Sequence, residues 1–223
     1  MTAPADIAFL LDVDNTLIDN DAVQDDLRNY LEREFGHEAR DRYWAILEAL
    51  RDELGYVDYI GALQRYRLGA LNDPRVLLIG SFLMDYCFAS RLHPAALDVI
   101  ARLAAWGPTV ILSDGDVVFQ PRKVQRSGLW NAVDGRVLIY VHKEDMLDEV
   151  ERLYPARHYV MADDKLRILA AMKTTWADRV TTIFVRQGHY ALDPASVESY
   201  PPADMTLDRI GDFLRHDRSA FAG

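Results

Sequence analysis

Five short apolar runs, separated by segments with helical spacing, decide what this chain can fold into. They begin at Ile7, Pro108, Arg136, His158 and Arg179. Each run is almost continuously apolar, which suits strands that are covered on both faces of a sheet. The segments between the later runs, such as HPAALDVIARLAAWG at 93–107, have the periodicity of amphipathic helices. Strands that alternate with helices predict an α/β fold with a doubly wound, Rossmann-like parallel sheet.

One long interval, residues 19–91, breaks this alternation because its segments all have helical spacing. It follows the first predicted strand and precedes the other four. We therefore expect a helical domain at 19–91, inserted into an α/β core catalytic domain that comprises residues 1–18 and 92–223.

Composition excludes several kinds of partner. A formal net charge of −10 and a pI near 5.0 argue against nucleic acid, which favours basic surfaces. No apolar run reaches the ~20 residues of a membrane span, and the N-terminus lacks the basic start of a signal peptide. The single cysteine, Cys87, excludes an internal disulfide and is expected to be a small core residue. We expect a cytoplasmic protein without a membrane partner.

Polar residues end four of the predicted strands. In an open parallel sheet, ligands bind beyond the carboxyl ends of the strands, so these residues are expected to lie together. They are Asp12, Asp14, Ser113, Asp114, Lys143, Asp163 and Asp164. Several carboxylates are tolerated side by side when a cation balances them. Mg²⁺ is the expected cofactor because it prefers hard oxygen ligands and commonly binds carboxylates together with a phosphate.

This set of residues has a definite chemistry. A carboxylate held against Mg²⁺ can attack phosphorus and form an aspartyl-phosphate. A second carboxylate can protonate the leaving oxygen and later accept a proton from water. We assign the first role to Asp12 and the second to Asp14.

The motifs in which these residues lie resemble those of the haloacid dehalogenase superfamily. DVDNT at 12–16 resembles its first motif, DxDx(T/V), and VILSDG, YVHKED and VMADD resemble the second, third and fourth in the same order. Two positions depart from the family pattern: Ala162 stands where Gly is usual, and Glu144 where many members have Pro. The resemblance covers roughly residues 6–20 and 90–215, and it implies that the helical insertion is a cap.

The resemblance also implies a role for each residue. Ser113 would hydrogen-bond a phosphoryl oxygen, helped by backbone N–H groups around Asp114 and Gly115, while Lys143 would neutralise the phosphoryl charge. The metal would be held by Asp163, Asp164 and the side chain of Asp12, with Asp14 contributing its backbone carbonyl. Which of Asp163 and Asp164 contacts the metal directly is left open.

Two other lysines compete for a role near these motifs. Lys123 lies in a predicted helix and is expected to be solvated, so we favour Lys143 as the cation of the site. Lys165, beside the fourth motif, is expected to be a surface charge.

The leading hypothesis is a Mg²⁺-dependent phosphatase that acts on a small phosphorylated metabolite. Asp14 favours phosphoryl chemistry, because the metal-independent dehalogenases of the superfamily lack this second Asp. A phosphomutase of the same superfamily and a non-catalytic phosphoaspartate signalling module are the alternatives. The substrate and the oligomeric state are not predicted.

Overall fold

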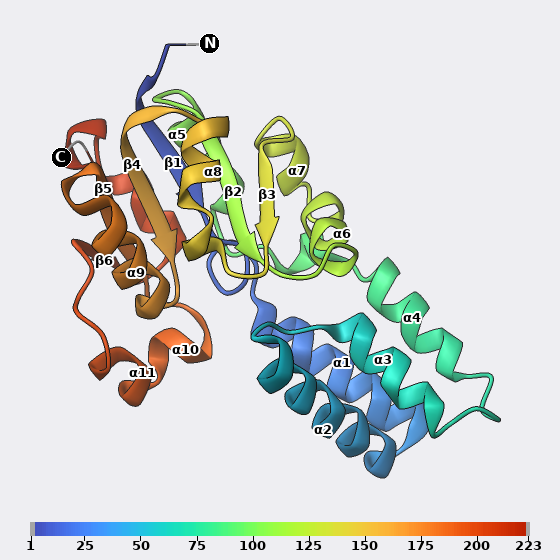
Figure 1. Cartoon of the computed structure of the whole chain (residues 1–223). Coiled ribbons are helices and arrows are strands. Elements are labelled where there is room, and N and C mark those ends of the chain that lie inside the picture. Colours follow the sequence, from blue (N-terminus) through green and yellow to red (C-terminus); the bar gives the residue numbers. More distant parts are fainter. Residues whose placement is uncertain (1–2, 222–223) are drawn as a thin grey trace.

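A six-stranded parallel sheet forms the centre of the molecule in the computed structural model, which describes residues 3–221 (Figure 1). Its strands lie in the order β3-β2-β1-β4-β5-β6. Their bounds are β1 Ala5–Leu11, β2 Thr109–Asp114, β3 Val137–Tyr140, β4 Ala156–Asp163, β5 Val180–Val185 and β6 Met205–Leu207. Each predicted strand is present, which confirms the α/β, doubly wound fold.

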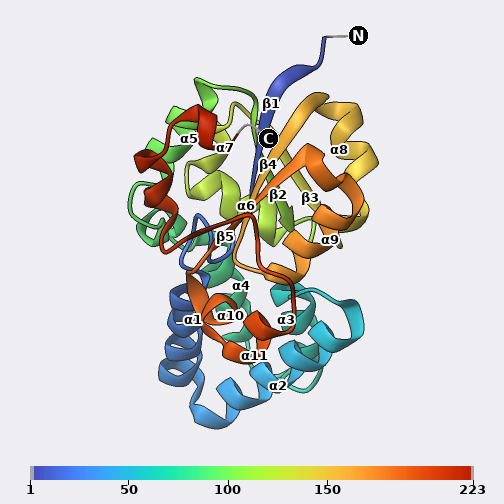
Figure 2. The ribbon, with the colours of Figure 1, turned by 90° about the vertical axis from the view of Figure 1, so that its left-hand side faces the viewer.

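Helices cover both faces of the sheet, which explains why the strands are apolar throughout. In β1, Phe9 and Leu11 belong to one hydrophobic cluster, whereas Ala8 and Leu10 belong to another. The first cluster includes residues of α5 (Ala96–Ala104), α6 (Phe119–Arg126) and α7 (Leu129–Ala132), and the second includes residues of α8 (Leu147–Leu153) and α9 (Leu166–Trp176). Figure 2 shows the two groups of helices on opposite sides of the sheet.

Four helices occupy the interval in which a helical insertion was expected. They are α1 Asn20–Phe35, α2 His37–Leu54, α3 Tyr59–Leu68 and α4 Val76–Asp85. They lie together beyond the carboxyl ends of the strands, as do the short helices α10 (Gly188–Leu192) and α11 (Pro194–Glu198) (Figure 1). The exact division of the chain into a core and a domain at 19–91 remains a prediction.

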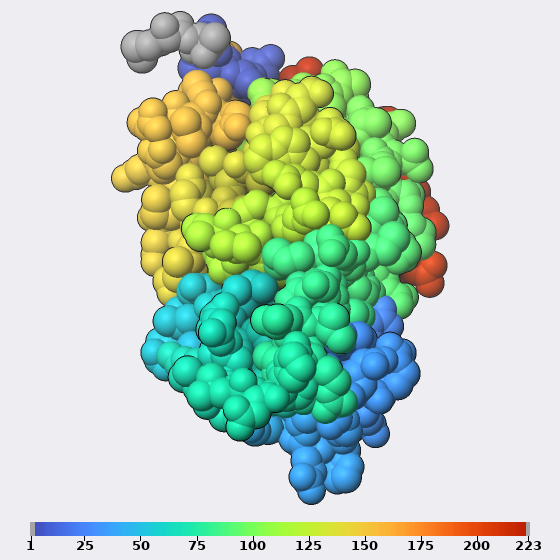
Figure 3. Space-filling model, turned by 90° about the vertical axis from the view of Figure 1, so that its right-hand side faces the viewer, coloured from blue at the N-terminus to red at the C-terminus, as the bar shows by residue number. Residues whose placement is uncertain are grey.

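Helix α6 holds the last helix of the insertion in place. Arg122 donates to the carbonyl of Met84 at 3.1 Å, and Arg126 donates to that of Asp85 at 2.8 Å. These carbonyls end α4 and have no partner within that helix, so the two arginines satisfy them. Figure 3 shows α4 directly below α6 on this face of the molecule.

The most apolar stretch of the insertion, residues 76–90, is short. Within residues 3–221, no helix has both the length and the apolar character needed to cross a bilayer. The expectation that Cys87 is a core residue is wrong, because its side chain is exposed. It follows the end of α4, and the adjacent Phe88 takes the buried position.

Candidate functional site

Three aspartates meet at the carboxyl ends of the neighbouring strands β1 and β4. Asp12 directly follows β1, and its N–H donates to the Ala162 carbonyl of β4 at 3.0 Å. Asp163 ends β4 and Asp164 follows it. One carboxylate oxygen from each aspartate lies within 4.8 Å of the others, and all three side chains are buried. Parallel pairing of the two strands therefore brings the first and fourth motifs together, as expected.

Lys143 is the ammonium group of this cluster. Its Nζ donates to Asp12 Oδ1 at 2.5 Å and lies 2.6 Å from Asp163 Oδ2, a contact with the distance of an ion pair but not the angle of a hydrogen bond. Its backbone N–H donates to Asp114 Oδ1 at 2.8 Å, which fixes the segment after β3. Burial alone would lower the pKa of Lys143, but Asp12, Asp163 and Asp114 raise it, so the lysine stays charged.

Asp164 lacks a direct partner of this kind, although the charges of Lys165 and Lys143 offset part of the effect of burial on its pKa. Both of its carboxylate oxygens are buried without a hydrogen-bond partner among residues 3–221, and burial raises its pKa well above the usual range. Asp163 differs, because Oδ1 accepts from the Lys165 N–H at 2.8 Å while Oδ2 faces Lys143. Burial also raises the pKa of Asp12, to about 6. A metal ion would supply the charge that Asp164 lacks, so the cluster fits a metal, with Asp164 as the carboxylate whose ligand atoms are free.

Ser113 lies at the end of β2 and is buried. Its Oγ accepts a hydrogen bond from Gln120 Nε2 at 3.0 Å. The Gly115 N–H donates to the Tyr140 carbonyl at 2.9 Å as part of the sheet. That amide is therefore already used within the sheet, and the Ser113 hydroxyl, which itself donates to the Asp114 carbonyl at 3.3 Å, is the side-chain hydroxyl that this strand end provides.

The expectation that Lys123 is solvated is wrong. Its side chain is fully buried, and Nζ donates to Asp14 Oδ1 at 2.6 Å and to Asn20 Oδ1 at 3.0 Å. The helix that carries it, α6, packs against the strand ends, so this lysine faces the site rather than water. Asp14 itself remains partly exposed, with 30% of its side-chain surface accessible.

A cavity of about 630 Å³ lies between the strand ends, the insertion and α10. The strand ends contribute Asp14, Asp114 and Asp164, the insertion contributes Asn20, Asp21, Arg28, Arg51 and Tyr59, and α10 contributes His189 and Tyr190. Lys165 also lines it, with Nζ 5.0 Å from the centroid of the Tyr190 ring, so its assignment as a surface charge is wrong. The volume suits a small-molecule substrate.

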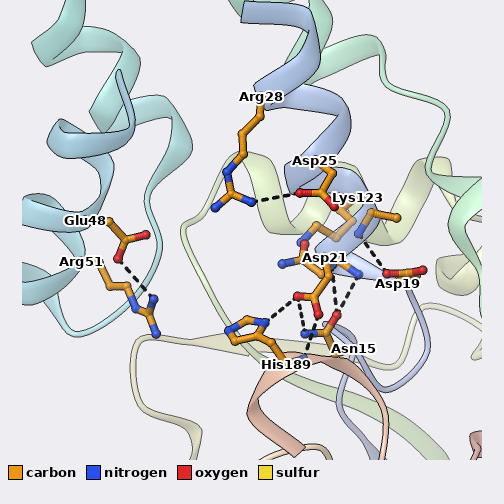
Figure 4. Close-up of polar contacts among 11 residues, drawn as sticks. Asn15, Asp19, Asp21, Asp25, Arg28, Glu48, Arg51, Lys123 and His189 are labelled. Carbon is orange, nitrogen blue, oxygen red and sulfur yellow. Dashed lines mark hydrogen bonds and ion pairs between the residues drawn. The ribbon is translucent and has the colours of Figure 1, made fainter. Parts of the chain in front are cut away.

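Sequence reasoning missed the segment after β5, which joins the strand ends to the insertion. His189 Nδ1 lies 2.6 Å from Asp21 Oδ1, and the His189 N–H donates to Asp21 Oδ2 at 2.8 Å. Asn15 donates to the same carboxylate at 3.1 Å, as Figure 4 shows. Behind them, Gln187 donates to the carbonyls of Asn15 and Thr16. The rule that ligands bind at strand ends, applied to the fifth strand, points to RQGHY at 186–190.

Gly188 makes this arrangement sterically feasible. Its φ is +74°, and a Cβ at this position would lie 2.3 Å from Asn15 Cγ. We expect Gly188→Ala to lower the free energy of unfolding by about 2 kcal/mol, as the sum of the positive-φ cost and the clash. Gly36→Ala is the matched control, because Gly36 has a φ of +90° but open space around the added Cβ. Denaturant unfolding of both variants measures the difference, and equal losses would contradict the clash.

The chain is similar to solved structures over nearly its whole length. A protein of Burkholderia xenovorans LB400 that bears the description haloacid dehalogenase-like hydrolase is 64% identical; the match covers 97% of this chain and 98% of that chain, with a TM-score of 0.93. The L-2-haloacid dehalogenase from Xanthobacter autotrophicus shares the fold at 20% identity, with 93% and 96% covered and a TM-score of 0.61.

A Bacillus subtilis HAD-hydrolase bound to magnesium also shares the fold, at 15% identity, with 95% and 98% covered and a TM-score of 0.65. No protein-family model and no curated protein matches the chain. The likeness to the Burkholderia protein is high enough, and covers enough of both chains, to establish the family. The chain therefore belongs to the haloacid dehalogenase-like hydrolases.

Proposed function

We propose that this hydrolase is a Mg²⁺-dependent phosphatase that cleaves a small phosphomonoester through an aspartyl-phosphate on Asp12. The observation that carries the proposal is Asp14, a second carboxylate that borders the cavity two residues after Asp12. Phosphoester cleavage needs a group that protonates the leaving oxygen, and Asp14 is suited to that task.

The donor set supports Mg²⁺ as the metal. Asp12 and Asp164 would bind it through side-chain oxygens, with Asp163 beside them and Asp14 contributing its backbone carbonyl. Mg²⁺ would neutralise charge on the phosphoryl group and orient it for attack. The magnesium in the Bacillus subtilis structure supports this choice.

The side chains of the protein would carry out the remaining steps of the reaction. Lys143 engages Oδ1 of Asp12 and leaves Oδ2 to attack phosphorus. As the new P–O bond forms, the bond to the leaving oxygen breaks, and Asp14 gives that oxygen a proton. Ser113 donates its hydroxyl to a phosphoryl oxygen, and Lys143 balances the negative charge that builds up. Water then attacks the phosphorus, Asp14 takes its proton, and Asp12 and inorganic phosphate are released.

Two other reactions compete with this proposal. Hydrolysis of a haloacid is suggested by the similarity to dehalogenases. A halide ion leaves without a proton, however, so that reaction would not use Asp14 as a general acid. A phosphomutase would use the same residues and pass the phosphoryl group to a second hydroxyl. A signalling module is no longer favoured, because the similar solved structures are described as hydrolases and dehalogenases.

The test is product release from purified enzyme. We expect inorganic phosphate from p-nitrophenyl phosphate and from members of a sugar phosphate and nucleotide panel, only when Mg²⁺ is present and not with excess chelator. Chloride release from L-2-chloropropionic acid is measured in parallel. Chloride release without phosphate release would overturn the proposal, and transfer of phosphate between hydroxyls of one substrate would replace it by the mutase.

A further inference from the structure

Helix α6 presents two buried polar side chains to the strand ends. Gln120 and Lys123 are three residues apart and therefore project from the same side of the helix. Lys123 is 0% exposed and Gln120 is 3% exposed. Burying an ammonium group is costly unless an opposite charge and hydrogen bonds compensate for the lost hydration. The partners of Lys123 therefore indicate why a lysine is placed there.

Those partners lie at the site. Lys123 Nζ donates to Asp14 Oδ1 at 2.6 Å and to Asn20 Oδ1 at 3.0 Å, which uses two of its three donor hydrogens. Gln120 Nε2 donates to Ser113 Oγ at 3.0 Å and reaches Asp14 Oδ1 at 3.4 Å. Every side-chain hydrogen bond that Asp14 accepts from residues 3–221 thus ends on Oδ1.

This pattern holds one oxygen of the Asp14 carboxylate and leaves the other oxygen without a side-chain hydrogen bond from residues 3–221. Oδ1 of Asp14 is fastened to a buried cation on a helix, while the residue as a whole lines the cavity. The second cation of the cluster, Lys143, is occupied by Asp12 and Asp163. The two lysines therefore serve different carboxylates, and Lys123 serves Asp14.

We propose that Lys123 is a positioning residue that holds Asp14 by Oδ1 so that Oδ2 can exchange a proton with the leaving oxygen of the substrate. This inference rests on the proposed phosphatase function. In this scheme Lys123 contacts neither the phosphoryl group nor a carboxylate oxygen that would bind the metal, because Asp14 would contribute only its backbone carbonyl there, and Lys123 acts through the Asp14 side chain alone. Proton transfer requires a donor within hydrogen-bond reach and in the right direction, which a carboxylate free to rotate satisfies less often.

The test compares two substrates of similar shape. The p-nitrophenolate of p-nitrophenyl phosphate leaves without a proton, whereas the phenolate of phenyl phosphate is a poorer leaving group and benefits from one. We expect Lys123→Met to lower kcat/KM for phenyl phosphate about 100-fold and for p-nitrophenyl phosphate less than about tenfold. The reason is that general acid catalysis matters only for phenyl phosphate. Equal losses on both substrates would overturn the proposal.

A double-mutant cycle tests whether Lys123 acts through Asp14. Asp14→Asn should show the same dependence on the leaving group. Adding Lys123→Met to Asp14→Asn should then change kcat/KM less than about threefold, since residues that act as one unit are not additive. Multiplicative losses in the double variant would show that Lys123 has another role and would overturn the proposal.

Two controls separate positioning from folding. Lys173→Met makes the same change in α9, where the lysine pairs with Asp204 at 2.9 Å near the start of β5, and it should not alter the ratio between the substrates. Lys123→Gln keeps a donor in a similar volume and provides the comparison if Lys123→Met does not fold. If wild-type enzyme hydrolyses neither substrate nor any other phosphomonoester, the proposed function fails. If wild-type enzyme is active but the Lys123 variants leave the ratio of kcat/KM between the two substrates unchanged, only the positioning role is overturned.

Discussion

Asp12→Asn is expected to reduce phosphate release by about 10⁴-fold or more, because an amide cannot form the phosphoryl-enzyme. Lys143 should keep its place through Asp163, to which it lies at 2.6 Å, so the variant is expected to remain folded. The measurement is initial-rate phosphate release at saturating Mg²⁺, together with the thermal midpoint. Asp217→Asn is the matched control, since the Asp217 side chain is 90% exposed and the residue lies outside the four motifs.

A direct observation of the intermediate strengthens this experiment. Wild-type enzyme quenched in acid during turnover should carry phosphate on Asp12, and Asp12→Asn should carry none. Loss of less than about tenfold in the variant would mean that another group attacks phosphorus, and it would contradict the assignment of Asp12 as the nucleophile.

The fold could be predicted from the sequence because strands that are buried on both faces of a sheet are apolar at nearly every position. Residues that alternate between the two hydrophobic clusters, such as Phe9 and Leu10, must all be apolar, so each strand appears as a continuous run. The rule for strand ends then places Asp12, Ser113, Lys143 and Asp163 at one edge without any knowledge of their distances. The sheet topology alone is enough to predict that these residues lie together.

Lys123 shows where such reasoning stops. A lysine within a helix is usually solvated, and the pattern of a single helix does not say which neighbour covers it. Its burial depends on the packing of α6 against the strand ends and on Asn20, which comes from the insertion. The arrangement combines segments about 100 residues apart, and no local pattern encodes it.

The difference between Asp163 and Asp164 is a second case. Both residues have the same side chain and adjoin the same strand, so the sequence treats them alike. In the structure, Asp163 points toward Lys143, whereas Asp164 has no hydrogen-bond partner among residues 3–221. Opposite effects are therefore expected from the same substitution at the two positions.

Asp164→Asn is expected to raise the thermal stability of the metal-free protein and to weaken Mg²⁺ binding about 100-fold or more. Replacing a buried carboxylate, whose charge is incompletely balanced, by a neutral amide should increase the free energy of unfolding by about 1–2 kcal/mol. Asp163→Asn should act in the other direction and cost about 2 kcal/mol or more, because it breaks an ion pair with Lys143 inside the protein. Thermal melts in chelator measure both changes.

Titration with Mg²⁺ completes the comparison. A ligand that binds only the folded state stabilises it by about 2.7 kcal/mol at a hundred times its Kd, so wild type should gain stability as Mg²⁺ is added. Asp164→Asn should gain much less at the same concentrations, which calorimetric titration would confirm independently. If Asp164→Asn destabilises the metal-free protein and binds Mg²⁺ as wild type does, then Asp164 is not the free metal ligand. The cluster would then have to bind its cation through Asp12 and Asp163, each of which already has one carboxylate oxygen facing Lys143.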